Sequence, residues 1–409
     1  MRRRFGRRLI HIGMETTVMN DMRGLPYRLR LPGPTAVPER VRHAIADLVV
    51  DHHGPEFHAL VGEIQSRIRP IFGTRGKVLT FAGSGTAAME AALANVAPPG
   101  TPVLVVAHGQ FGVRFGQIAR ALGCAVDVLE VEWGTAPDPA VIRQRLEQRD
   151  YSVLCVTHNE TSTGVTADLR AIGELTKDRS TLLLVDSVSG LAGLPVEQDR
   201  WHLDLVIGAS QKALMCPPGI GLVGVGAKAW AVIERDHGGR FFWDFRKAGA
   251  ALDKMESAFT PPVSLLAGLA EALRMIDKEG FAKVLARHRR LAAGLRAGLV
   301  ALDFAPFPRE AASDTVTVMR MPEGLDGNAM IRRLYEDYRT VVAGSRTHLS
   351  GKLIRIGTMG HVNESDILTD LHYIERTLAD LGRAPREGAG VAAAAALLAR
   401  PPAERRAAA

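Results

Sequence analysis

The chain has 409 residues, 46% of them hydrophobic and 23% charged, which excludes a disordered or fibrous protein and gives enough volume for two or three domains. Its net charge of +7 suggests an anionic partner such as nucleic acid or a membrane surface. However, residues 1–30 hold eight arginines against two acidic residues, and residues 383–409 hold five against two, so the span between them is slightly acidic. The basic excess therefore belongs to the two ends, and we expect neither a nucleic-acid nor a membrane partner.

The cysteine pattern and the apolar runs indicate the cellular compartment. Cys124, Cys155 and Cys216 lie far apart and match no metal-ligand spacing, so we expect no disulfide framework and no metal site. No apolar run reaches the roughly 18 residues of a membrane helix, and the stretch 9–12 is too short for a signal-peptide core. We therefore expect a cytoplasmic protein.

Short apolar runs rich in β-branched residues alternate with segments of helical period. The expected strands are residues 77–81, 102–107, 125–131, 152–157, 181–186, 204–208 and 219–225. The expected helices among them are residues 87–96, 113–122, 139–148 and 168–176. This alternation predicts an α/β fold with a mostly parallel, seven-stranded sheet flanked by helices.

Beyond residue 261 the pattern changes to longer helices with two strands. We expect helices at 263–276, 281–302 and 364–381, and strands at 314–320 and 352–356. This predicts a smaller C-terminal α+β domain that closes over the first. The predicted division is a basic N-terminal extension (1–28), a large domain (29–280), a small domain (281–382) and an Ala/Arg-rich tail (383–409), which frays except for a short helix at 391–398.

Chemically capable residues directly follow several expected strands, where parallel sheets bind their ligands. Lys212 follows the strand 204–208, and a partly desolvated lysine has a lowered pKa and forms Schiff bases, although it could also simply reach water. The sequence Gly-Ser-Gly-Thr at 83–86 joins a strand to a helix and lacks the lysine of a Walker loop, so it is either a site for a small phosphate ester or an ordinary capped turn.

Two further residues complete a recognisable set. Asp186 ends a buried run and needs a cationic partner such as a protonated ring nitrogen, unless it only caps the next turn. Phe111 follows the second strand, where it either stacks on a ring or packs in the core. A phosphate cup, an amine and a buried carboxylate are together what pyridoxal 5'-phosphate requires from a protein.

Eight motifs occur in order along roughly residues 29–382. They are LPGPT at 31–35, DHHGPEF at 51–57, GSGTAA at 83–88, THNETSTG at 157–164, VDSVS at 185–189, GASQK at 208–212, TPPV at 260–263 and RIGTMG at 355–360. The set resembles the class V aminotransferases of the fold-type I pyridoxal phosphate enzymes, in particular the alanine-glyoxylate and serine-glyoxylate branch.

The resemblance implies a role for each matching residue at the cofactor ring. It makes Lys212 the Schiff-base lysine and proton shuttle. Asp186 would pair with the pyridine nitrogen, and Val188 would pack beneath the ring. Phe111 stands where the family has an aromatic stacking residue, and Thr161 would lie near the ring hydroxyl.

The resemblance also implies how the phosphate is bound. Ser84, Gly85, Thr86 and Gln211 would hold it, joined by Thr260 from the other subunit, which makes a homodimer with shared active sites the expected working unit.

The substrate would be held by arginine, and here the chain departs from the family pattern. The resemblance implies that Arg355 clamps the substrate carboxylate, but Arg346 is a second arginine nearby, where the family has a glycine-rich segment. It either recognises a further anionic group or pairs with a loop carboxylate. Ser257 replaces a common tyrosine and His53 a common arginine.

The implied activity is ping-pong transamination from serine, alanine or aspartate to glyoxylate or pyruvate. The alternatives are a donor with a second anionic or unusual group, such as a phosphonate or pyridoxamine, and a lyase of the same superfamily. A cysteine desulfurase needs a reactive cysteine in the last third of the chain, and no cysteine follows Cys216. A cofactor-free nucleic-acid binder acting through the basic ends is the rival from another class.

Overall fold

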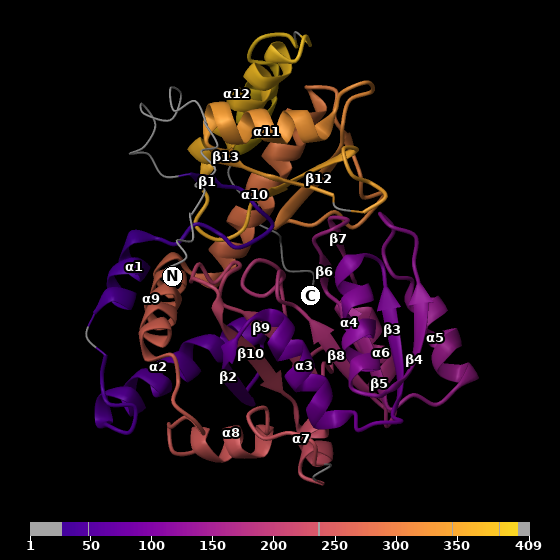
Figure 1. Cartoon of the computed structure of the whole chain (residues 1–409), viewed down its shortest axis with the longest axis vertical. Helices are drawn as coiled ribbons and strands as arrows, with labels where there is room; N and C mark the ends of the chain where they lie inside the picture. The colour runs from indigo at the N-terminus through magenta and orange to yellow at the C-terminus, as the bar shows by residue number, and fades with distance from the viewer. Residues whose placement is uncertain (1–26, 48, 236–237, 346, 384, 400–409) are drawn as a thin grey trace, which may run out of the picture.

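The computed structural model describes residues 27–47, 49–235, 238–345, 347–383 and 385–399. Within them a large sheet lies among helices. A smaller sheet with its own helices lies beyond one end of the strands of the large sheet (Figure 1). No helix in this described part is long and apolar enough to cross a membrane.

Seven strands form the large sheet. They are β2 (Lys77–Gly83), β3 (Pro102–Ala107), β4 (Ala125–Glu130), β5 (Val153–Thr157), β8 (Leu182–Asp186), β9 (Leu205–Ala209) and β10 (Gly219–Val225). Their order is β2-β10-β9-β8-β5-β3-β4, and all neighbours are parallel except β10, which is antiparallel to β2 and β9. Every residue of β5, β8 and β9 is buried, because helices cover both faces of the central strands. The prediction of a mostly parallel, seven-stranded sheet is confirmed.

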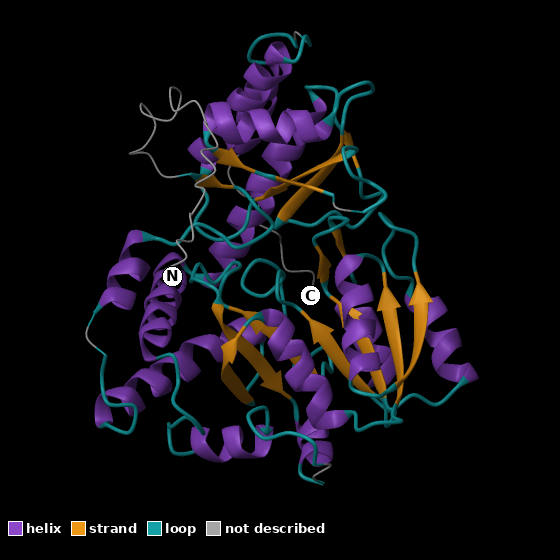
Figure 2. Cartoon of the chain, in the orientation of Figure 1, coloured by secondary structure: helices purple, strands orange, loops and turns teal. Residues whose placement is uncertain are grey.

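Helices surround this sheet. They are α1 (Glu39–Ala46), α2 (Pro55–Phe72), α3 (Gly85–Val96), α4 (Gln110–Ala121), α5 (Pro139–Gln148), α6 (Leu169–Thr176), α7 (Ala227–Ile233), α8 (Phe245–Leu252) and α9 (Val263–Glu279). The predicted helices correspond to α3 to α6 and α9, whereas α1, α2, α7 and α8 were not predicted. The purple helices of Figure 2 lie on either side of the orange strands, so the sheet forms a buried middle layer.

The C-terminal part has its own sheet and its own apolar core. Its strands are β11 (Ala305–Pro306), β12 (Val316–Arg320), β14 (Ala343–Gly344) and β15 (Leu353–Gly357), in the order β11-β12-β15-β14. Its helices are α10 (Phe281–Val300), α11 (Gly327–Tyr338), α12 (Glu364–Asp380) and α13 (Ala389–Leu398). Because α10 places Val284 in the core of the large sheet and Leu291 in the C-terminal core, the boundary near residue 280 stays a prediction.

Helix α13 agrees with the short helix expected at 391–398 and begins two residues earlier. Ala394 and Leu398 are buried against the C-terminal core, and Arg290 Nη1 on α10 donates a hydrogen bond to the carbonyl of Leu398 at 2.8 Å. The carboxylate of Glu375 accepts hydrogen bonds from the backbone N–H of Gly390 at 2.7 Å and of Val391 at 3.3 Å, in the first turn of α13. Residues 389–398 of the tail are therefore held by packing that their composition does not reveal.

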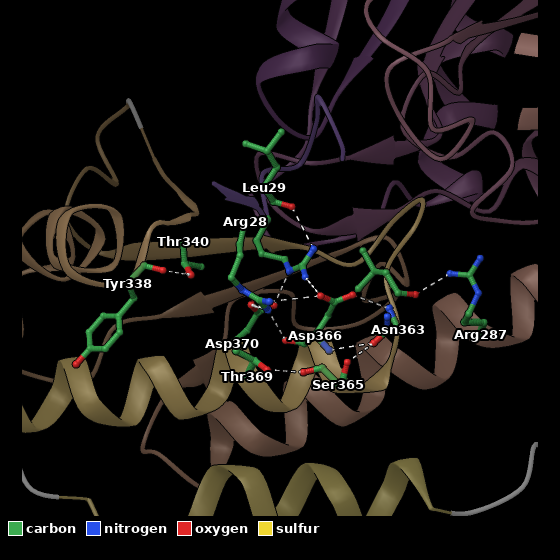
Figure 3. Close-up of polar contacts among 12 residues, drawn as sticks. Arg28, Leu29, Arg287, Tyr338, Thr340, Asn363, Ser365, Asp366, Thr369 and Asp370 are labelled. Carbon is green, nitrogen blue, oxygen red and sulfur yellow. Dashed lines mark hydrogen bonds and ion pairs between the residues drawn. The ribbon is translucent and has the colours of Figure 1, made fainter. Parts of the chain in front are cut away.

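The start of the described chain is fastened to the C-terminal part (Figure 3). Strand β1 (Arg28–Leu29) pairs in parallel with β13 (Thr340–Val341). Arg28 Nη2 and Arg30 Nε donate to the two carboxylate oxygens of Asp370 on α12, each at 2.7 Å, and Arg30 also pairs with Asp366. Arg30 is 4% exposed and Asp370 1%, so these charges neutralise one another inside the protein. We call residues 28–35 the N-terminal strap, because they run from α12 to Lys212.

Candidate active site

The predicted residues gather beyond the carboxyl ends of the central strands, on the side that faces the smaller sheet. In Figure 2 the arrowheads of the right-hand strands of the large sheet point toward the smaller sheet. After β5 the chain forms a hairpin of β6 (Asn159–Glu160) and β7 (Val165–Thr166), which was not predicted. From the smaller sheet, Arg355 on β15 reaches this hairpin, and its Nη1 donates to the carbonyl of Thr161 at 3.2 Å.

The N-terminal strap covers Lys212. Lys212 Nζ donates to the carbonyl of Pro32, and the hydroxyl of Thr35 donates to the carbonyl of Lys212 at 2.9 Å. Gly33 has φ +104°, and a Cβ at this position would lie 2.4 Å from Lys212 Cδ and 2.5 Å from its Nζ. Only glycine leaves the lysine side chain its present space.

The charge of Lys212 depends on its surroundings. The pKa of Lys212 is lowered to about 8, chiefly by burial; the carboxylate of Asp186 opposes this shift, and the charges of Arg355 and Arg114 add to it. At neutral pH a minor fraction of this amine is thus unprotonated and able to attack a carbonyl, which is far more than an exposed lysine offers.

Asp186 ends β8 as a buried carboxylate that lacks a full counter-charge. It is 4% exposed, and its Oδ1 accepts a hydrogen bond from the N–H of Val188 at 3.0 Å. The pKa of Asp186 is raised to about 6, chiefly by burial and also by the nearby Glu160, against the hydrogen bond from the N–H of Val188. Burial also lowers the pKa of His108 to about 4 and that of His158 to about 3, so both histidines are neutral and supply no positive charge. A protonated ring nitrogen would complete this site.

The loop from β2 to α3 has the features of a phosphate cup. Ser84 caps α3 by accepting a hydrogen bond from the N–H of Ala87 at 3.3 Å, while the N–H groups of Gly85 and Thr86 have no acceptor within the helix. A Cβ at Gly85 would lie 2.7 Å from Val188 Cγ2, which places the cup beside Val188, two residues after Asp186. Gln211 Oε1 is buried without a hydrogen-bond partner among the described residues.

Phe111 is held by a buried acid whose role the sequence did not reveal. Glu160 Oε2 accepts hydrogen bonds from the N–H of Phe111 at 2.8 Å and of Gly112 at 3.2 Å, and its Oε1 accepts from the hydroxyl of Ser162 at 2.6 Å. The carboxylate thus lies at the N-terminus of α4, where the helix dipole favours negative charge. Gly109 permits this approach, since a Cβ there would lie 2.3 Å from Glu160 Cγ.

Other predicted positions lie apart from this cluster or outside the described residues. Thr260 is exposed, and no hydrogen bond among the described residues joins it to the cofactor residues of its own chain. The N–H of His53 donates to Asp51 Oδ1 at 3.0 Å, which suggests no chemical role. Arg346 lies outside the described residues, so its role stays a prediction.

The cysteines do not provide a reactive thiol. Cys124, Cys155 and Cys216 are free and buried. Burial raises the pKa of Cys216 to about 12, and it also raises the pKa of the other two thiols. These thiols therefore stay protonated at neutral pH, which disfavours the desulfurase alternative.

The fold and this site define a pyridoxal phosphate enzyme of fold-type I. Residues 32–366 match the family described as Aminotransferase class-V, and the chain belongs to that family. An uncharacterized aminotransferase of Methanocaldococcus jannaschii is 37% identical over 358 residues, 87% of this chain and 93% of that protein. Serine–glyoxylate aminotransferase of Methylorubrum extorquens is 34% identical over 383 residues, 90% and 95% of the two chains. The crystal structure of ureidoglycine-glyoxylate aminotransferase from Bacillus subtilis matches with a TM-score of 0.87 at 29% identity, covering 91% of this chain and 98% of that one.

The chain is therefore an aminotransferase that uses pyridoxal 5'-phosphate. The residues fit this cofactor on three counts. The carboxylate of Asp186 is buried and forms no ion pair among the described residues, the amine of Lys212 has a lowered pKa, and the neutral phosphate cup lies at a helix N-terminus.

Proposed function

We propose that this enzyme transfers the amino group of a small amino acid, namely serine, alanine or aspartate, to glyoxylate, with pyruvate as a second acceptor. The observation that carries the proposal is the lysine of lowered pKa beside a buried carboxylate, in the frame of a class-V aminotransferase. The Methylorubrum and Bacillus enzymes support the acceptor, because both are named for glyoxylate although their donors differ. The three free cysteines are compatible with a cytoplasmic location.

We assign the residues around the cofactor ring as follows. Pyridoxal phosphate, when bound, supplies an electron sink that makes the Cα proton of the donor removable. Lys212 would hold the cofactor aldehyde through its amine, and once the amino group of the donor has replaced it there, the released Lys212 amine would take the proton from the donor Cα and return it to the cofactor. Asp186 would keep the ring nitrogen protonated, Val188 and Phe111 would pack on the ring, and Thr161 would lie near its hydroxyl.

The phosphate is assigned to the cup. Ser84, Gly85 and Thr86 offer it N–H and hydroxyl donors at the start of α3, and Gln211 offers its side-chain amide.

Arg355 is the proposed substrate clamp. Its Nε and Nη2 donate to the carbonyl of Gly344 at 2.9 and 2.7 Å, and its Nη1 contacts the hairpin that carries Thr161. The guanidinium is thereby held between the two sheets, where a carboxylate can accept two parallel hydrogen bonds from it.

We further propose that the working unit is a homodimer in which Thr260 completes the partner's phosphate site. Phe241 is 70% exposed and Phe242 39%, and their rings lie 5.4 Å from that of Phe259, directly before Thr260. An exposed aromatic cluster of this kind is typical of a protein interface.

The donor and acceptor are tested in separate half-reactions of the holoenzyme. Serine, alanine and aspartate are each added alone, and the loss of the visible absorption of the lysine-bound cofactor is followed; glyoxylate or pyruvate is then added to restore it. We expect glyoxylate to have a kcat/KM about 10- to 100-fold above that of pyruvate, because one additional methyl group changes binding by that order. A spectrum that none of the three donors changes contradicts the proposal.

The shared site is tested by subunit mixing. Lys212→Ala removes the amine, and Thr260→Glu places a negative charge against the partner's phosphate, so each variant alone should be inactive. Co-expressed and purified through two different tags, the mixed dimer should regain about half of the wild-type activity, since one of its two sites is intact. A mixed dimer as inactive as its parents shows that the sites are not shared.

Each of two alternative functions can be tested specifically. A donor with a second anionic group depends on Arg346, and it fails if Arg346→Ala leaves the ratio of kcat/KM for aspartate and alanine unchanged. Nucleic-acid binding depends on the basic ends, of which residues 1–26 and 400–409 lie outside the described residues. It requires salt-dependent DNA binding that is lost when residues 1–30 are removed, together with no uptake of the cofactor.

A further inference from the structure

Arg114 is a cation of the active site to which neither the motifs nor the assignments above give a role. It follows Phe111 by one turn of α4, and its guanidinium carbon lies 4.8 Å from the centroid of the Phe111 ring. Its Nη1 lies 3.5 Å from the hydroxyl oxygen of Thr86 in the phosphate cup. No ion pair in the described ranges involves Arg114, although the side chain is partly buried.

The position of Arg114 is fixed by the residues around it. Glu160 binds the first backbone N–H groups of α4, so the turn that carries Phe111 is anchored at its start. Residues three apart on a helix lie on the same face, and a guanidinium stacks favourably on an aromatic ring. Phe111 therefore serves as a platform that directs the Arg114 charge toward Thr86.

The rest of the cup is neutral. Ser84, Gly85, Thr86 and Gln211 provide hydrogen-bond donors but no full charge, whereas a phosphate ester carries between one and two negative charges at pH 7. The charge of Arg114 also acts on the neighbouring groups, since it lowers the pKa of both Lys212 and Asp186.

We propose that Arg114, held on the Phe111 ring, is the positioning cation of the phosphate site and selects the phosphorylated cofactor over its unphosphorylated form. The inference rests on the proposed cofactor site. Arg114 acts by its charge and by Nη1, which faces the hydroxyl of Thr86 at the cup.

The test measures binding of pyridoxal phosphate and of pyridoxal to cofactor-free enzyme by equilibrium dialysis. In Arg114→Met we expect the Kd of pyridoxal phosphate to rise about 10- to 100-fold, the size of a lost charge-assisted hydrogen bond, and that of pyridoxal to change less than about threefold. Arg114→Lys keeps the charge and should recover most of the loss. Arg120→Met is the matched control, because Arg120 is an exposed arginine on the same helix; it should change neither Kd.

The outcomes separate this inference from the proposed cofactor site. Equal losses for pyridoxal phosphate and pyridoxal in Arg114→Met overturn the inference, because the arginine then acts only through Phe111. Unchanged binding of both in that variant also overturns it. A wild-type protein that binds neither compound overturns the cofactor site itself.

Discussion

Replacing Lys212 with alanine is expected to reduce kcat by about 10⁴-fold, the upper end of what a positioned acid-base group contributes. The variant should also lack the visible absorption of the lysine-bound cofactor, because no other amine takes its place at the end of β9. Burial lowers the pKa of Lys212 to about 8, so capture of the cofactor by the wild-type protein should accelerate with rising pH and level off above that value. Stopped-flow absorbance across pH 6 to 10 measures both effects.

Lys177→Ala is the matched control for this experiment. Lys177 is an exposed lysine that pairs with Glu174 at 2.7 Å, and its removal should change neither the spectrum nor the rate. If Lys212→Ala retains both the absorption and the activity, another residue holds the cofactor and the assignment is wrong.

Replacing Gly33 with alanine is also expected to reduce the activity strongly, though less than Lys212→Ala does. In Gly33→Ala the new Cβ would lie 2.4 to 2.7 Å from Cδ, Nζ and Cε of Lys212, so the lysine must move. A displacement of about 1 Å at a reacting group reduces the rate by about 10²-fold. The variant should fold and bind the cofactor weakly, and its kcat is measured at saturating cofactor.

Gly100→Ala is the control that separates backbone strain from displacement of Lys212. Gly33 and Gly100 both have positive φ, +104° and +86°, so alanine strains the backbone at either position. Gly100, however, has no atom within 4 Å of an added Cβ. Both variants should lose stability by about 1 to 2 kcal/mol, measured by urea unfolding, but only Gly33→Ala should lose activity. Equal activity in the two variants shows that the strap does not shape the lysine site.

Local sequence determines much of this fold and part of the site. Each strand of the large sheet is a short apolar run between turn residues, and Asp186 and Lys212 come directly after such runs, so their common edge could be predicted. Helix α2 was missed although it carries the signal, since Phe57, Val61, Ile64, Ile68 and Ile71 recur at helical spacing and are buried.

The remaining site residues depend on contacts that no local pattern encodes. Glu160 contacts the N–H of Phe111 across 49 positions, and Lys212 contacts Pro32 across 180. Only tertiary packing brings such residues together. Arg114 is intermediate, because its spacing of three from Phe111 predicts a shared helix face but not the approach to Thr86.

The N-terminal strap also constrains the order in which the protein is made. Its anchor joins Arg30 to Asp370, 340 positions later, so the strap cannot be fastened until α12 has left the ribosome. At roughly 5–20 residues per second, the nascent chain waits about 17 to 70 s between synthesis of the strap and of its acidic partners. The large sheet can form during this interval, whereas the strap over its lysine still lacks the ion pairs with α12. Cofactor added to ribosome-bound chains that end before α12 therefore meets a lysine site whose strap is not yet anchored at Arg28 and Arg30.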